Sequence, residues 1–352
     1  MQEPAAGRTT PHRISIVIPV YQGEKTLPAL IGEIAPLTAG FTSPGGRAAT
    51  IAEVLLVCDN GPDDSARVMR SLAAQHFFVR TVWLSRNFGQ HAATLAGMAS
   101  SGGDWIVTLD EDGQHNPGEI GAMLDAAMDA QADIVYGKPT NVAPHGPLRN
   151  LASRLAKLLT TASAGDTNAV DFHSYRMMLG EVGRSVAAYA GVGVYLDVAI
   201  GWVSRKTTTC PITLRSEGDR PSGYSFRSLV SHFWRMVVSS GTRALRLVSL
   251  LGMLFAIAGM ALAAFFVLAT WFGHSDIPRG WPSLMVVVLL CSGAILFSLG
   301  VIAEYIGVAV NMAMGKPLYL IVSDPDVGPL GRGNTATQTS PDLQAATHTV
   351  TR

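Results

Sequence analysis

The sequence predicts an α/β fold with a mostly parallel sheet, followed by helices that enter a membrane. Between residues 13 and 136, short apolar runs alternate with helical patterns, as expected of repeated βα units. Hydrophobic residues make up 48% of the 352 residues, and their excess lies near the carboxyl end. The formal net charge is zero and charged residues amount to 15%. This composition argues against a basic surface for nucleic acid and points to a lipid bilayer as a partner.

The predicted elements of the α/β part follow from hydrophobic periodicity. The strands are expected at 14–20, 51–57, 79–84, 105–109 and 134–136, and 211–214 is a candidate for a last strand. The helices are expected at 27–34, 66–76 and 92–99. The segment 36–50 is rich in Gly, Pro and Thr, which predicts a long exposed loop. Helices on both faces would cover the sheet, because its strands are continuous apolar runs.

The carboxyl-terminal part has the pattern of a membrane hairpin. Residues 226–246 mix aromatic side chains with arginines, which predicts an amphipathic helix on the membrane surface; an ordinary surface helix is the alternative. Residues 247–272 carry no charge and residues 283–310 carry one, Glu304, so each can span a bilayer. Basic residues flank the outer ends, which places both termini and the large domain in the cytoplasm.

The remaining boundaries follow from composition. Residues 1–12 and 324–352 are polar and predicted to be disordered, and 311–323 form a juxtamembrane segment. The amino terminus has no apolar signal region, so the sequence predicts an inner or plasma membrane protein with a cytoplasmic domain.

An acidic loop follows the strand at 105–109. Asp110 and Asp112 share one side if the chain stays extended through Glu111. Open α/β sheets bind ligands at the carboxyl ends of their strands, and carboxylate oxygens suit Mg²⁺ or Mn²⁺. An ordinary acidic surface turn is the alternative, because two aspartates at this spacing are common.

Several motifs together resemble a known family. They are IVIPVYQGE, VCDNGPDDS, LSRNFG, GDWIVTLDEDGQHNPGE, RNLASR and DFHSYR, followed by a hydrophobic hairpin that contains EYIG. This set is similar to the polyprenyl-phosphate glycosyltransferases of glycosyltransferase family two, of which dolichol-phosphate-mannose synthase is the best-known type. The similarity covers residues 13 to 320. It implies a GT-A nucleotide-sugar domain, which is Rossmann-like, at 13–225, before the surface helix and the hairpin.

The resemblance assigns residues to a nucleotide-sugar donor. The residues implied for the nucleotide-sugar are Pro19, Tyr21, Glu24, Asp59, Arg86 and Gly89. Asp59 matches the aspartate that accepts a hydrogen bond from the base. The residues implied for a metal and the diphosphate are Asp110, Asp112 and Gln114, with Asp110 and Asp112 as the catalytic pair. The family's lysine after the third loop is replaced by Gln90.

Neighbouring residues of these loops are expected to be structural. Glu111 is expected to face away from the site, and His115 to support the loop. Asp63 and Asp64 are expected to cap a helix, and a turn-capping role is the alternative reading of Asp59.

The resemblance also assigns an acceptor side. Arg149 and Ser153 stand one helical turn apart, hence on one face, and match the arginine and serine that hold a lipid phosphate. Arg154 and Arg176 match family positions near the site, and Lys138 is the nearest cation to an arginine that is missing after Gly137. Arginine suits phosphate because its planar donors bind two oxygens at once. Without the resemblance, Arg149 and Arg154 would be read as solvated helix charges.

The implied activity is inverting, metal-dependent transfer of one sugar from a UDP- or GDP-sugar to polyprenyl phosphate at the cytoplasmic face. A lipid monophosphate is already ionised near pH 7, so a general base is not required, although Asp112 is the nearest candidate. A processive polysaccharide synthase is a second reading, but its Q-x-x-R-W motif is absent. A non-catalytic membrane scaffold is a third. Related two-span enzymes imply a possible tetramer.

Overall fold

The computed structural model describes residues 10–141, 173–191, 196–204, 206–215, 257, 281–315 and 317–327. The chain divides into two compact units. Unit 1 comprises residues 1–125, 174–187 and 319–352, and unit 2 comprises residues 126–173 and 188–318. The predicted acidic loop and the predicted nucleotide loops all belong to unit 1.

Unit 1 is built on a mixed sheet. Its parallel part consists of four neighbouring strands, in the order β5 (Trp105–Thr108), β1 (His12–Val20), β3 (Ala48–Cys58) and β4 (Val79–Leu84). An antiparallel strand flanks each side of this part, β7 (Arg176–Leu179) beside β5 and β9 (Ile321–Val322) beside β4. The predicted α/β sheet is confirmed for the parallel part, whereas these two flanking strands make the sheet mixed.

The buried strands form because their side chains are apolar on both faces. Ile14, Ile16 and Val17 in β1 are completely buried, as are Leu55 and Leu56 in β3. Full burial of an aliphatic side chain contributes about 1.5–3 kcal/mol, so these runs dominate the stability of unit 1. Such strands need helices on both faces.

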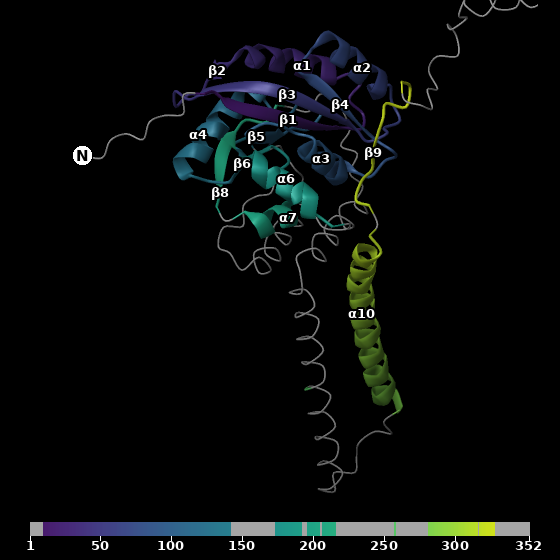
Figure 1. Cartoon of the computed structure of the whole chain (residues 1–352). Helices are drawn as coiled ribbons and strands as arrows, with labels where there is room; N and C mark the ends of the chain where they lie inside the picture. Colours follow the sequence, from purple (N-terminus) through teal and green to yellow (C-terminus); the bar gives the residue numbers. More distant parts are fainter. Residues whose placement is uncertain are drawn as a thin grey trace, which may run out of the picture. The chain divides into compact units, whose positions relative to one another are not determined.

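The described residues of unit 1 include four helices apart from the one that it shares with unit 2. They are α1 (Leu27–Ile34), α2 (Ser65–Gln75), α3 (Gln90–Ala99) and α6 (Gly180–Tyr189). Figure 1 shows α1 and α2 on one side of the strands and α3 on the other. Helix α3 lies very close to the sheet at Gly97, where a Cβ atom would be 2.3 Å from Val17 Cγ1. A larger residue there would push the helix, and the loop that precedes it, away from the sheet.

The segment 36–50 is largely exposed, as predicted, but it forms an anchored hairpin where the sequence predicts a loop. A 3₁₀ turn (η1, Ala35–Ala39) leads to β2 (Phe41–Thr42), which pairs antiparallel with the start of β3. The Asp125 carboxylate accepts hydrogen bonds from Ser43 Oγ and Gly45 N, both at 2.6 Å, and pairs with Arg47. Burial raises the pKa of Asp125, but these donors outweigh it and hold the pKa below its usual range. The sequence did not reveal this hairpin, because Asp125, which anchors it, lies far away along the chain.

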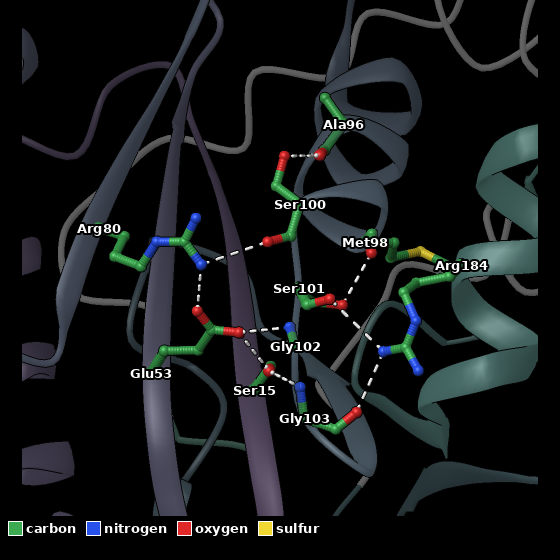
Figure 2. Close-up of polar contacts among 10 residues, drawn as sticks. All are labelled: Ser15, Glu53, Arg80, Ala96, Met98, Ser100, Ser101, Gly102, Gly103 and Arg184. Carbon is green, nitrogen blue, oxygen red and sulfur yellow. Dashed lines mark hydrogen bonds and ion pairs between the residues drawn. The ribbon is translucent and has the colours of Figure 1, made fainter.

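A second cluster lies where the strands of unit 1 begin. Glu53 accepts hydrogen bonds from Ser15 Oγ at 2.7 Å and from Gly102 N at 2.6 Å, and it pairs with Arg80 (Figure 2). Arg184 of α6 donates to the carbonyl oxygen of Gly103 at 3.1 Å (Figure 2). This amino edge therefore joins β1, β3, β4 and the loop before β5.

The carboxyl-terminal strand of unit 1 is held by an ion pair. Arg70 of α2 donates from Nε and Nη2 to the two carboxylate oxygens of Asp324, at 2.8 and 2.7 Å. Asp326 also pairs with Arg70, whose guanidinium lies 4.8 Å from the centre of the Trp83 ring. Residues 324–327 are therefore attached to α2, although the sequence predicts disorder from 324.

In unit 2, β6 (Ile134–Pro139) pairs parallel with β8 (Thr207–Ile212). The candidate strand at 211–214 thus begins earlier than expected, at a polar Thr-rich run. Helix α4 (Ile120–Ala130) follows a 3₁₀ turn (η2, Pro117–Glu119) and crosses from unit 1 into unit 2. Helix α7 spans Leu196–Val203, and the buried Asp197 lies 3.5 Å from the hydroxyl of Tyr136.

Helix α10 spans Trp281–Ala313 and contains the predicted second membrane span. In the part of the chain that the structure describes, no helix combines the length and hydropathy required to cross a membrane. The predicted surface helix at 226–246 lies outside the described residues. The predicted first span at 247–272 does so too, apart from Ile257.

Candidate functional site

The candidate site lies at the carboxyl edge of the parallel strands of unit 1. Four loops leave this edge, at 21–26 after β1, 59–64 after β3, 85–89 after β4 and 109–116 after β5. Parallel strands bring the loops that follow them to one edge of a sheet, the usual place for a ligand in an open α/β fold. Hydrogen bonds between these loops decide which of the predicted side chains come together.

Glu111 ties the acidic loop to the loop after β1. Its Oε2 accepts a hydrogen bond from Tyr21 N at 2.9 Å, and its Oε1 accepts one from Gln22 N at 2.8 Å. The prediction that Glu111 faces away from the site is therefore wrong. Residues 111 and 112 form a turn, so the strand alternation that motivated the prediction ends at Asp110. Tyr21 itself is 44% exposed, with its ring available to a ligand.

The loop after β1 is also held from the start of α2. Gly23 N donates to Ser65 Oγ at 2.8 Å, and Ser65 Oγ donates to Asp63 Oδ1 at 2.6 Å. Asp63 Oδ2 accepts from Glu24 N at 3.1 Å, and the Glu24 carboxylate accepts from Asp64 N at 3.4 Å. The predicted capping role holds for Asp63, whose Oδ1 also accepts from Ser65 N at 3.3 Å, whereas Asp64, the N-cap residue of α2, makes no side-chain capping hydrogen bond. The contacts of Glu24 are with residues 63–64, while Pro19 is buried within β1.

Asp59 holds the loop after β4. It is 3% exposed, and its Oδ1 and Oδ2 accept hydrogen bonds from Phe88 N at 2.7 Å and Gly89 N at 2.9 Å. Burial raises the pKa of Asp59, and the two backbone N–H groups oppose this shift without overcoming it. Gly89 has φ +91°, which favours glycine, and it caps the amino end of α3. Recognition of a base by Asp59 stays a prediction.

Arg86 lies in the same loop. Its guanidinium stacks 4.3 Å from the centre of the Phe88 ring, and its side chain is exposed. The loop thus carries an exposed cation at the carboxyl edge, and its backbone is held by the hydrogen bonds to Asp59.

Asp110 is held by two neutral side chains. Its Oδ1 accepts from Gln90 Nε2 at 2.7 Å, and its Oδ2 accepts from Ser174 Oγ at 2.5 Å. Gln90, noted in the sequence as a replaced lysine, therefore directs a neutral donor at the first aspartate. Ser174 was not singled out, although it lies in the quoted motif DFHSYR. Both are further members of the site.

The buried His115 supports this loop, as predicted. Its Nδ1 accepts from Asp110 N at 3.2 Å, and its ring stacks on Tyr175 with a centroid separation of 4.9 Å. Tyr175 in turn donates from its hydroxyl to Asn116 O at 2.9 Å.

The metal prediction can be tested against the donor atoms. Asp112 Oδ1 accepts from Gln114 N at 3.0 Å, which closes a turn through Gly113 at φ +75°. Because the chain turns here, the extended geometry that was to align Asp110 and Asp112 is absent. Within the described ranges, no group of three or more His, Cys, Asp or Glu residues could hold a metal ion. Two partly exposed aspartates and an amide oxygen suit a hard cation if substrate and water complete its shell.

The predicted acceptor residues are only partly described. Arg149, Ser153 and Arg154 lie outside the described residues. Arg176 is 3% exposed at the start of β7, and its Nε donates to Thr108 Oγ1 at 3.3 Å. This places Arg176 in the interior of unit 1, beside the end of β5 that precedes the acidic loop. Lys138 is exposed on β6 of unit 2.

Comparisons with known proteins agree with the motifs. Residues 15–183 match the family model of glycosyl transferase family 2. The chain is 32% identical over 314 residues to an undecaprenyl-phosphate 4-deoxy-4-formamido-L-arabinose transferase of Pseudomonas aeruginosa, covering 88% of this chain and 89% of that one. It is 30% identical over 315 residues to the Yersinia enterocolitica protein of that name, covering 88% and 92%.

Solved structures resemble the fold more distantly. Glucosyl-3-phosphoglycerate synthase of Mycobacterium tuberculosis, in complex with Mn²⁺, UDP and phosphoglyceric acid, is 17% identical with a TM-score of 0.48, covering 66% of this chain and 78% of that one. The sequence relatives cover more of the chain. Their identity and coverage show that the chain belongs to the polyprenyl-phosphate glycosyltransferases of glycosyltransferase family 2.

Proposed function

We propose that this glycosyltransferase moves one sugar from a nucleoside-diphosphate sugar to undecaprenyl phosphate. The observation that carries the donor half is the bonding of the carboxyl-edge loops to one another through Glu111, Asp59 and Asp110. The relatives support the acceptor half, because their names specify undecaprenyl phosphate. The donor class, UDP- or GDP-sugar, rests on the resemblance of the loops to nucleotide loops.

The proposed reaction does not require a general base. The lipid phosphate is ionised, with a second pKa of about 6, so its oxygen can attack the anomeric carbon directly. The bond from that carbon to the diphosphate oxygen breaks as the new bond forms, and attack from the opposite side inverts the configuration. Catalysis then consists of positioning and electrostatic stabilisation of the departing diphosphate.

The charge of the leaving group suits a divalent cation. Asp110 and Asp112, with the amide oxygen of Gln114, would hold Mg²⁺ or Mn²⁺ together with donor phosphate oxygens and water. Such a cation would neutralise negative charge on the diphosphate. Gln90 and Ser174 fix the orientation of Asp110. Arg86, exposed on the adjoining loop, is placed to add a further positive charge.

The acceptor phosphate is proposed to bind Arg149, Ser153 and Arg154, of which the first two share one face if the chain is helical there, as the sequence predicts. A guanidinium that binds two phosphate oxygens would orient the nucleophile. We further propose a cytoplasmic catalytic domain and a membrane hairpin at 247–272 and 283–310, supported by the hydropathy of these runs.

The topology can be tested by cysteine labelling with a membrane-impermeant thiol reagent. A Ser275→Cys variant is expected to react from the non-cytoplasmic side, and Thr337→Cys only after the membrane is opened. Wild-type protein gives the background from its own cysteines. Labelling of both variants from the same side would exclude the hairpin.

The transfer reaction can be tested with radiolabelled UDP- and GDP-sugars and membranes that contain the protein. Label is expected to enter the lipid extract with one donor, in proportion to added undecaprenyl phosphate. A polymeric product would favour a processive synthase. Absence of both transfer and donor hydrolysis over a broad donor panel would favour a non-catalytic scaffold.

A further inference from the structure

Glu111 connects its own loop, the acidic loop, to the loop after β1, and the proposed function assigns these two loops to opposite ends of the donor. Tyr21, in the loop after β1, belongs to the nucleoside end. Asp110 and Asp112, which flank Glu111 in the chain, belong to the diphosphate end. The carboxylate of Glu111 accepts from two successive backbone N–H groups, those of Tyr21 and Gln22, at 2.9 and 2.8 Å.

The geometry requires a carboxylate at this position. Each oxygen accepts one N–H, so an amide would turn its NH₂ group toward one of the two donors and lose that hydrogen bond. The neighbouring Gly23 also fits closely, because a Cβ atom there would be 2.8 Å from Glu111 Oε2. Gly61, in the loop after β3, also lies close to this backbone, because a Cβ atom there would be 1.4 Å from Tyr21 O. The backbone of Tyr21 is therefore confined by contacts from two other loops.

We propose that Glu111 is a positioning residue that sets the place of Tyr21 relative to the two aspartates. This inference rests on the proposed donor site. It assigns a role in donor binding to Glu111, the residue between Asp110 and Asp112. Glu111 acts through the backbone of residues 21–22 and does not contact the donor. Loss of the clamp should weaken binding of a complete nucleoside diphosphate far more than binding of its phosphates alone.

The test compares two probes on three proteins. Calorimetric titrations with Mn²⁺ present would measure binding of UDP, GDP and inorganic pyrophosphate to wild type, Glu111→Gln and Glu181→Gln. Glu181 is an exposed glutamate in the first turn of α6, so it is the matched control for the same change. Loss of one charge-assisted hydrogen bond corresponds to about a ten- to hundredfold weaker affinity.

For Glu111→Gln we expect this ten- to hundredfold loss of affinity for UDP or GDP, and a change of less than about threefold for pyrophosphate. For Glu181→Gln we expect wild-type affinity for every probe. A merely structural role would weaken both probes together, so equal losses would overturn the inference. Unchanged UDP and GDP affinity would also overturn it. If Glu111→Gln does not fold, Glu111→Asp, whose shorter side chain reaches one N–H group, is held to the same criterion. Wild type that binds neither UDP nor GDP would refute the donor proposal itself, and the inference with it.

Discussion

Two carboxylates of the β3 region are held differently: Glu53 is half-buried at the middle of β3, and Asp59 is buried directly after its end. Beside the beginnings of β1 and β4, Glu53 accepts hydrogen bonds from Ser15 and Gly102 and has Arg80 as a counter-charge (Figure 2). Directly after its end, Asp59 accepts hydrogen bonds from the backbone N–H groups of Phe88 and Gly89. Glu53 is therefore held partly by an ion pair, whereas the hydrogen bonds that Asp59 accepts come from neutral donors.

The pKa shifts follow this difference. Burial raises the pKa of Glu53, but its hydrogen bonds and Arg80 outweigh burial and hold the pKa below its ordinary value. Burial also raises the pKa of Asp59, and there the two N–H groups do not overcome it. A carboxylate whose charge is incompletely compensated costs stability, and proteins tolerate such costs mainly at functional sites. We therefore expect the amino edge to serve folding, and the carboxyl edge to be the place of the proposed donor site.

The largest effect is expected at the carboxyl edge from Asp112→Asn. If Asp112 lies beside the diphosphate as proposed, its replacement removes several kcal/mol of charge stabilisation, or about a thousandfold in transfer rate. Transfer of labelled sugar to undecaprenyl phosphate measures it. Asp129→Asn, an exposed aspartate on α4, is the matched control. Full activity of Asp112→Asn, or of wild type in excess EDTA, would contradict the proposed metal site.

An intermediate effect is expected from Asp59→Asn. The asparagine keeps one acceptor for the loop at 85–89 but presents an NH₂ group to the second N–H, so the loop loses its fixed position. We expect about a ten- to hundredfold loss of UDP or GDP affinity in the presence of Mn²⁺. Calorimetry on the purified variant measures it. Wild-type affinity would show that neither the base nor the loop depends on this carboxylate.

A smaller effect, on stability alone, is expected from Glu53→Gln. At neutral pH the variant should lose about 1–3 kcal/mol of unfolding free energy, with donor affinity unchanged. Because the folded pKa of Glu53 lies below its ordinary value of 4.5, its contribution is present above that value and is lost as pH falls through the folded pKa. Denaturant unfolding of both proteins at several pH values measures this. A stability difference that stays constant down to pH 3 would refute the assignment.

Local patterns in the sequence were sufficient for many elements. The strand at 79–84 was predicted with the bounds that the structure shows, because a short apolar run is delimited by turn residues. The roles of Asp63 and His115 also followed from local motifs. The elements that failed depend on distant partners. Asp125 anchors the hairpin about Ser43 across 82 residues, and Glu111 reaches Tyr21 across 90.

The site shows the same limit. Motif similarity found the aspartates and the exposed Tyr21, which are local features. It did not find that Gln90 and Ser174 hold Asp110, because those contacts depend on how α3 and β7 pack against the acidic loop. The direction of Glu111 was predicted by strand alternation, which no longer applies once the chain turns after Asp110.

Hydrogen–deuterium exchange on the wild-type protein tests the central difference between the two edges most directly. Saturating UDP or GDP with Mn²⁺ is predicted to slow exchange of the amides of Tyr21, Gln22, Phe88 and Gly89 at the carboxyl edge. The amides of Gly102 and Gly103 at the amino edge should exchange as in the free protein. Unchanged exchange at the carboxyl edge under demonstrated saturation, or equal protection at both edges, would contradict the assignment of the donor site.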